Sequence, residues 1–245
     1  MDGKTGVCLI IGAGDDTGAA LARAFAQDGL ITCLVRRERH ADALENLAQS
    51  IRDTGHQALA FPADARDEEA MIALFDKIEA EVGPIEVAVF NIGANVMFKA
   101  TETTARVYRK VWEMACFAGF LMGREAAKRM QERKRGTIIF TGATASVRGG
   151  KMFSAFASAK HALRAFAQSL AREMGPQNIH VAHTIIDGAI DSNFIRENFP
   201  HVDDLRANDG ILNPDHIAQN YVMLHHQPRS AWTHELDLRP WSEKW

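Results

Sequence analysis

Residues 7–29 read VCLIIGAGDDTGAALARAFAQDG, and this stretch decides the fold. Five apolar residues, a turn with three glycines and an amphipathic segment that opens near Thr17 predict a strand, a tight turn and a helix. Gly12, Gly14 and Gly18 allow a ligand to approach the backbone closely at the N-terminus of that helix, where free N–H groups favour an anion. The stretch therefore predicts a phosphate-binding loop, although such glycines can also be turn residues alone.

Two acidic residues, Asp15 and Asp16, lie within this loop. Their carboxylates oppose a bound phosphate and themselves suit the N-terminus of a helix, so they could occupy the place that a phosphate favours. Exposed charges are screened beyond about 10 Å. We therefore expect a weakened phosphate site rather than a closed one.

The second apolar run is followed by Arg36 and Arg37. An acidic residue at the end of this strand holds the ribose diol of NAD, whereas an arginine accommodates the 2′-phosphate of NADP. The solvated start of the next helix would also explain two arginines. If a dinucleotide binds, the sequence favours NADP over NAD as the cofactor.

Short apolar runs alternate with amphipathic stretches along the chain. Such runs are typical of strands covered on both faces, and the alternation implies strand–helix–strand units of a parallel sheet. The predicted strands are residues 7–11, 31–35, 57–61, 86–90, 137–140 and 181–186. The predicted helices are residues 17–29, 39–54, 67–82, 103–133 and 156–174. We expect an α/β fold, a three-layer doubly wound parallel sheet in a single domain over residues 1–245.

The alternation weakens after about Asp187. Residues 191–213 read as a loop with short helical pieces, and an insertion beyond the carboxyl ends of the strands is the place for a substrate lid. A last helix near 214–227 and a strand near 232–238 complete the predicted domain.

The composition is that of an ordinary globular protein. Of 245 residues, 47% are hydrophobic and 24% are charged, which argues against disorder. A net charge of −3 favours neither nucleic acid nor an anionic membrane as a partner, and no run approaches the roughly 20 apolar residues of a spanning helix. Three scattered cysteines, Cys8, Cys33 and Cys116, predict neither a disulfide framework nor a metal cluster. We expect a cytoplasmic protein with no metal and no targeting segment.

In order and spacing, these motifs resemble those of the short-chain dehydrogenase/reductase family over nearly the whole chain. The family's T-G-x-x-x-G-x-G motif corresponds to residues 11–18, with Asp16 in place of the middle glycine and Ile11 in place of the threonine. The adenine-contacting acid corresponds to Asp64, and the N-A-G sequence to residues 91–93. The resemblance implies a Rossmann fold that binds NADP or NAD. The implied cofactor residues are Gly12, Gly14, Asp16, Thr17, Gly18, Arg36, Arg37, Asp64, Asn91, Gly93, Lys160, Gly188, Ile190 and Ser192.

The catalytic residues of the family are mostly replaced. Its Y-x-x-x-K motif stands here as F-A-S-A-K, so Lys160 is present while Phe156 replaces the tyrosine that acts as general acid/base. Ala143 replaces the serine and Cys116 the asparagine. A phenyl ring has no proton to give, and a positioned general acid contributes about 10²–10⁴ in rate. The sequence resembles a subgroup of the family with phenylalanine at this position.

Six nearby side chains can be weighed as replacements for the tyrosine. They are Thr144, Ser154, Ser158, Cys116, His161 and His183. The pKa of a hydroxyl is too high for an acid acting alone, so packing or capping is the favoured interpretation of the first three, and it is also favoured for the Cys116 thiol, which could face the pocket. His161 points about 100° away from Lys160 on a helix, and His183 is favoured as a core histidine. Asp187, in place of a family proline, is either an ionisable group near the nicotinamide or a turn acid.

Three functions remain open from the sequence. The resemblance favours an NAD(P)-dependent oxidoreductase that moves a hydride to or from a carbonyl or alcohol, with a degenerate catalytic tetrad. The alternatives are a non-catalytic dinucleotide-binding or regulatory protein and a structural partner of an active paralogue. Retention of Lys160, Asn91, Asp64 and Gly188 favours the two functions that bind a dinucleotide. The resemblance also implies a homodimer or homotetramer, and the small-molecule substrate is not identified.

Overall fold

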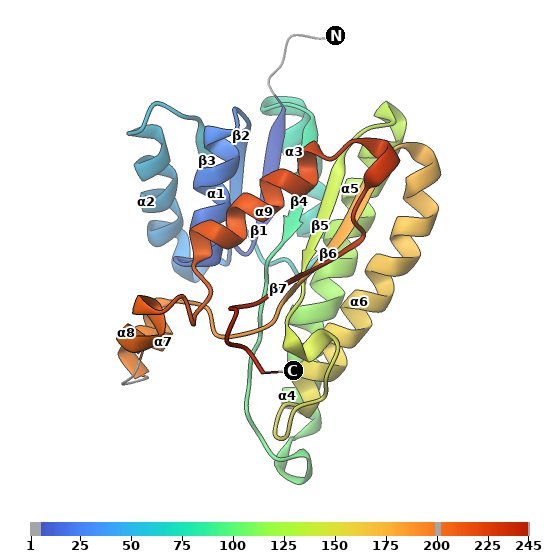
Figure 1. Ribbon diagram of the computed structural model, residues 1–245. Helices are drawn as coiled ribbons and strands as arrows, with labels where there is room; N and C mark the ends of the chain where they lie inside the picture. The colour runs from blue at the N-terminus through green and yellow to red at the C-terminus, as the bar shows by residue number, and fades with distance from the viewer. Residues whose placement is uncertain (1–5, 199–201, 245) are drawn as a thin grey trace.

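A parallel sheet forms the centre of the protein (Figure 1). The computed structural model describes residues 6–198 and 202–244. The strands are β1 (Val7–Ile11), β2 (Ile31–Arg36), β3 (Ala58–Pro62), β4 (Ile85–Phe90), β5 (Thr137–Thr141), β6 (His180–Ile186) and β7 (Glu235–Leu238). Their order across the sheet is β3-β2-β1-β4-β5-β6-β7, with every neighbouring pair parallel. The predicted doubly wound parallel sheet is confirmed.

Helices cover both faces of the sheet. One layer contains α1 (Thr17–Gln27), α2 (Ala41–Arg52) and α9 (Pro214–His226). The other contains α3 (Glu68–Glu81), α5 (Ala118–Arg133) and α6 (Ser154–Met174). Two apolar cores therefore lie on the two sides of the sheet, as three layers require.

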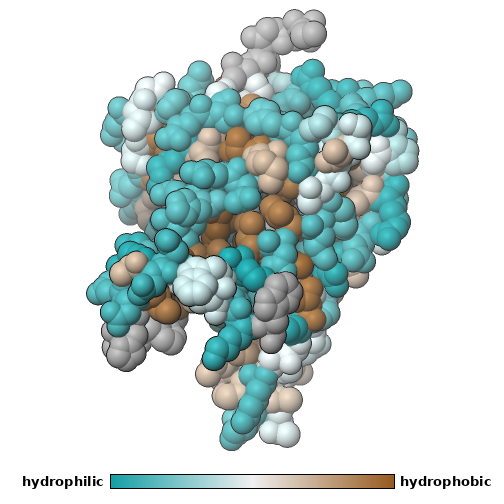
Figure 2. Space-filling model, viewed as in Figure 1, coloured by the Kyte–Doolittle hydropathy of each residue, from teal (hydrophilic) through white to brown (hydrophobic). Residues whose placement is uncertain are grey.

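The apolar runs form strands because both faces of each strand are buried. In β1, Val7, Leu9 and Ile11 face the core beneath α3, α5 and α6, whereas Cys8 and Ile10 face the core beneath α1, α2 and α9. Figure 2 shows hydrophobic residues gathered in the middle of the face that α9 crosses, surrounded by hydrophilic ones. Among the residues that the structure describes, no helix combines the length and apolarity needed to cross a membrane.

The helix predicted over residues 103–133 is interrupted. Helix α4 (Ala105–Trp112) and α5 are separated by a π-helical turn at Glu113–Phe117. A π turn accommodates an extra residue, so the side chains that follow it are rotated relative to an unbroken helix. The turn contains Cys116 and therefore changes the direction in which that residue points.

Residues 191–213 leave and rejoin the domain at one place. The N–H of Leu212 donates to Ala189 O and that of Asp191 to Leu212 O, each at 2.9 Å. Buried Asp191 pairs with Arg196 at 2.9 Å and Arg206 at 2.8 Å. These arginines belong to the two short helices of the segment, α7 (Asn193–Asn198) and α8 (Val202–Ala207). The segment has the predicted short helical pieces, while its action as a lid stays a prediction.

Candidate active site

The strand order reverses between β1 and β4, because the chain moves outward to β3 and then returns to the other side of β1. In open parallel sheets, ligands bind at such a point, beyond the carboxyl ends of the strands. A cavity of about 760 Å³ lies there. The predicted residues that line it are Gly12, Gly14, Asp16, Thr17, Gly18, Arg36, Asn91, Gly93, Ala143, Phe156, Lys160, Gly188, Ile190 and Ser192. The phosphate loop and the lysine segment therefore share one cavity.

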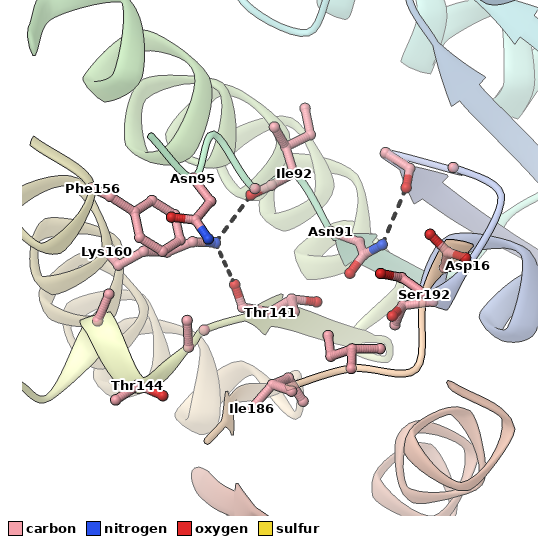
Figure 3. Close-up of a pocket in the computed structure, with 18 of the residues that line it drawn as sticks. Asp16, Asn91, Ile92, Asn95, Thr141, Thr144, Phe156, Lys160, Ile186 and Ser192 are labelled. Carbon is pink, nitrogen blue, oxygen red and sulfur yellow. Dashed lines mark hydrogen bonds between the residues drawn. The ribbon is translucent and has the colours of Figure 1, made fainter. Parts of the chain in front are cut away.

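Two glycines shape the phosphate loop. Gly12 has a φ of +98°, and a Cβ on it would lie 2.7 Å from Asn91 O. A Cβ on Gly18 would lie 2.5 Å from Gly12 O, closer than real Cβ atoms approach. The side-chain amide of Asn91 donates to Gly12 O at 3.1 Å, which fixes the loop against the end of β4 (Figure 3). The family pattern is kept at these two glycines because the backbone leaves no room for a side chain.

The two loop acids are engaged by other parts of the protein. Asp15 accepts hydrogen bonds from the guanidinium of Arg36 at 3.0 and 3.4 Å. Asp16 accepts one from the N–H of Asn193, at the start of α7, at 3.0 Å. Although Asp16 is the N-cap residue of α1, its side chain makes no capping hydrogen bond there. Asp16 therefore does not cap α1, although both acids line the cavity beside the phosphate loop, so a weakened phosphate site stays a prediction.

A second cavity of about 340 Å³ adjoins the first at Gly12, Arg36 and Asn91. It is strongly basic. Its charged and titratable lining residues are Arg36, Arg37, Arg39, His40, Asp64 and Arg66. Asp64 accepts a hydrogen bond from Arg66 Nε at 2.9 Å, and the hydrogen bonds from Arg66 lower the pKa of Asp64. Sequence reasoning missed Arg66, although an arginine two residues after the predicted acid was a usable signal.

Lys160 is fully buried at the other end of the larger cavity. Its Nζ donates to Ile92 O at 3.0 Å and to Thr141 O at 2.8 Å, and it lies near the ring of Phe156 (Figure 3). Burial lowers the pKa of Lys160 to about 7. Because the backbone of residue 92 provides the contact, isoleucine can replace the family's alanine there without loss.

The family's acid and hydroxyl positions form an apolar surface in this cavity. Phe156 and Ala143 line it, and the ring of Phe156 lies 5.8 Å from Lys160 Nζ. Cys116 lines neither cavity and packs in a buried cluster with Val111 and Phe156, where burial raises the pKa of its thiol. Cys116 is therefore a core residue. Asn95, Arg148, Phe153 and Ile195 are among the lining residues that sequence reasoning also missed.

Asp187 is a structural ion-pair residue. It is 1% exposed and lines neither cavity. Its carboxylate accepts hydrogen bonds from the Thr144 hydroxyl at 2.6 Å and from Arg148 at 2.7 Å, and Arg239 lies 3.2 Å away. These contacts favour the interpretation as a turn acid and give Thr144 a structural role as well.

Three other side chains weighed as replacements for the tyrosine also have hydrogen-bond partners within the protein. The Ser158 hydroxyl donates to Ser154 O at 2.7 Å within α6, and His161 Nδ1 lies 2.9 Å from Ala157 O. His183 is completely buried beside Glu235, and burial lowers the pKa of its imidazole to about 4. Of the ionisable groups weighed at the reaction end, Lys160 lines the cavity, whereas Cys116, His161, His183 and Asp187 do not.

A doubly wound sheet with a glycine loop at its switch point and a buried lysine at the neighbouring strand ends defines a dinucleotide-binding type of α/β protein. A sequence profile of the family described as short chain dehydrogenase matches residues 6–203, and the chain belongs to that family. The expected family is thereby confirmed.

Relatives and solved structures agree with this family. Versicolorin reductase stcU of Emericella nidulans is 30% identical over 191 residues, which cover 78% of this chain and 70% of that protein. The crystal structure of a short-chain dehydrogenase from Rhodopseudomonas palustris is 45% identical with a TM-score of 0.82, covering 96% of this chain and 99% of that one. An actinorhodin polyketide ketoreductase solved with NADPH is 21% identical with a TM-score of 0.86, covering 96% of both chains, and so shares the fold.

Proposed function

We propose that this protein is an NADP(H)-dependent oxidoreductase that interconverts a carbonyl and an alcohol. The observation that carries the proposal is the single cavity that runs from the phosphate loop to the buried Lys160. The names of relatives such as versicolorin reductase and 2,3-dihydro-2,3-dihydroxybenzoate dehydrogenase support this class of reaction.

The residues present fit a dinucleotide. The first turn of α1 has no side-chain cap, so its N–H groups can receive a diphosphate, and Gly12 and Gly18 let it approach the backbone. Asn91 would hold the ribose beside Lys160, and Gly188, Ile190 and Ser192 would surround the nicotinamide. When bound, the nicotinamide supplies or accepts the hydride.

The basic second cavity favours NADP over NAD. Arg36 and Arg37 lie where a ribose 2′-phosphate would be held, with Arg39 and Arg66 on the same lining. Guanidinium groups form strong paired hydrogen bonds with phosphate oxygens. Arg36 would exchange its exposed contact with Asp15 for the phosphate at little cost, since such exposed pairs contribute about 1 kcal/mol or less.

The proton at the reaction end has to come from a group other than Phe156. A protonated Lys160 donates two N–H groups to backbone carbonyls, which leaves a third for the cavity. Its lowered pKa, about 7, suits an acid that works near neutral pH. We therefore assign Lys160 the role of proton donor to the substrate oxygen.

A second candidate is a dinucleotide-binding protein without turnover. The observation that favours it is the apolar surface of Phe156 and Ala143 at the position where a reacting carbonyl needs hydrogen-bond donors. Both candidates require the cofactor to bind, and they differ only in hydride transfer.

Titration of the purified protein with NADPH and NADH, followed by nucleotide fluorescence and melting temperature, tests the proposal. We expect saturable binding that is at least about tenfold tighter for NADPH, and loss of that preference in Arg37→Ser but not in the control Arg172→Ser. Hydride transfer to a panel of aldehydes and ketones then separates the two candidates. Absence of binding at millimolar nucleotide would overturn both.

Self-association also forms part of the proposal. Tyr108 and Trp112 of α4 are exposed, and the Trp112 ring stacks on that of Phe117 at 5.7 Å. Exposed aromatic residues of this kind suit an interface with another subunit. Light scattering during gel filtration distinguishes a homodimer or homotetramer from a monomer.

A further inference from the structure

The C-terminal ends of α1 and α9 meet at the amino edge of the sheet, opposite the proposed cofactor cavity. Asp28 follows α1, and His225 and His226 are the last two residues of α9. One ligand atom from each of the three side chains lies within 4.8 Å of the other two. The Nε2 atom of His226 lies 2.8 Å from Asp28 Oδ1 and 2.9 Å from Oδ2. This edge is the upper one in Figure 1, where the N-terminal ends of the strands lie.

We propose that Asp28, His225 and His226 bind a Zn²⁺ ion. Two imidazoles and a carboxylate form a ligand set that zinc accepts, with water in the fourth position of a tetrahedron. Ligand atoms about 2 Å from a metal lie roughly 3.3 Å apart in a tetrahedron. The contact between His226 and Asp28 therefore needs to open by only about half an ångström, which two side chains at the surface can do.

The environment of His225 orients its ring for this role. Its Nδ1 lies 2.9 Å from the Thr137 hydroxyl, and its ring packs edge-on against Phe25 with centroids 6.4 Å apart. In the tautomer whose Nδ1–H donates to Thr137, Nε2 keeps its lone pair for a metal. A hydrogen bond to the second ring nitrogen is the usual way in which a histidine ligand is held in place.

The local field also favours a cation. The C-terminus of a helix carries partial negative charge from its free carbonyl groups, and two such termini converge here beside the Asp28 carboxylate. The opposite end of α1 carries the phosphate loop, and α9 directly follows the 191–213 segment. The ion would therefore join the two helices that position these regions. The site is remote from the cavity, so it does not depend on the proposed oxidoreductase function.

Isothermal titration of the full-length protein without a polyhistidine tag, using ZnCl₂ after chelator treatment, tests the proposal. We expect one equivalent to bind at micromolar zinc and to raise the melting temperature. His226→Ala and Asp28→Asn should each weaken binding by more than about tenfold, and Thr137→Val by about tenfold through the freed ring of His225. His216→Ala is the matched control, because it removes an exposed histidine at the other end of the same helix.

Binding that survives in the double variant Asp28→Asn with His226→Ala would place the ion elsewhere and overturn the proposal. Equal weakening in His216→Ala, or no saturable binding at micromolar zinc, would overturn it as well. Circular dichroism of each variant without zinc establishes that it is folded. Since His226 and Asp28 lie at the surface, we expect these substitutions to leave the fold intact.

Discussion

The two ends of the main cavity differ in what they retain of the family pattern. At the phosphate end, the features that match the family pattern act through the backbone: Gly12 and Gly18 leave no room for a side chain, and Asn91 holds Gly12 O. At the reaction end, the groups that should act through side chains are replaced by Phe156 and Ala143. The comparison favours our proposal that the cavity binds a dinucleotide and that its chemistry differs from the pattern expected for the family.

Lys160 lies at the reaction end of the cavity, and we assign it a role in the chemistry as well as a place beside the cofactor. Its hydrogen bonds go to backbone carbonyls, so its position does not depend on a tyrosine at residue 156. Burial of an amine disfavours its charged form and costs stability, and a hydrophobic side chain would pack there at lower cost. A lysine in this place therefore favours the two functions that bind a dinucleotide over a structural partner of an active paralogue.

The largest expected effect comes from restoring the reaction end. Phe156→Tyr with Ala143→Ser adds a proton donor and a hydroxyl to the apolar surface beside Lys160. We expect carbonyl reductase activity with NADPH to rise by about 10²–10⁴, the contribution of a positioned general acid. Phe156→Leu with Ala143→Ser is the control without a phenol. An unchanged rate in a double variant that binds NADPH would show that more than the acid has been lost.

Breaking the phosphate end should have the next largest effect. Gly18→Val places side-chain atoms against Gly12 O and Ala13 Cα, 2.5 and 2.8 Å from the added Cβ, and these are backbone atoms that cannot move aside. We expect the free energy of unfolding to fall by about 3 kcal/mol and dinucleotide binding to disappear.

Gly14→Ala is the matched control for that variant. A Cβ at Gly14 meets no atom within 4 Å, so the free energy of unfolding should change by less than about 0.5 kcal/mol. Urea denaturation and nucleotide titration measure both quantities. Equal loss in the two variants would show that the loop does not have this geometry.

The lowered pKa of Lys160 makes the free energy of unfolding depend on pH. Its pKa is about 7 in the folded protein and about 10.5 when unfolded, so between these values the unfolded chain binds more protons. The contribution of Lys160 to the free energy of unfolding therefore increases with pH across that range and is lowest below about pH 7. We compare the wild type with Lys160→Met, both without nucleotide. The free energy of unfolding of the wild type relative to that of the variant should rise by about 2 kcal/mol between about pH 7 and about pH 9. Urea denaturation at both pH values checks this, and a constant difference would contradict a lowered pKa.

Most of the fold could be predicted because its signals are local. Apolar runs buried on both faces predicted the strands, and the glycine spacing predicted the loop at the switch point. The π turn at Glu113–Phe117 escaped prediction because the sequence there has the pattern of a continuous helix.

The partners of charged side chains could not be predicted, because they come from distant parts of the chain. Asp15 meets Arg36 and Asp16 meets the backbone of Asn193. The buried ion pairs of Asp187 likewise use residues from other elements. Periodicity and motif spacing describe each segment alone, so they showed which acids were unusual but not what neutralised them.

The smallest expected effect concerns the exposed ion pair beside the phosphate loop. Asp15→Asn removes the charge that holds Arg36, and that guanidinium then no longer has to leave a partner to reach a 2′-phosphate. Since such a pair contributes about 1 kcal/mol or less, NADPH should bind about two- to fivefold more tightly, with NADH little affected. Asp53→Asn, the same charge change at the far end of α2, controls for net charge. The gain should shrink as salt is added, because exposed charges are screened. Equal gains for both nucleotides would mean that Arg36 does not contact the 2′-phosphate, leaving Arg37 as the residue that selects NADP.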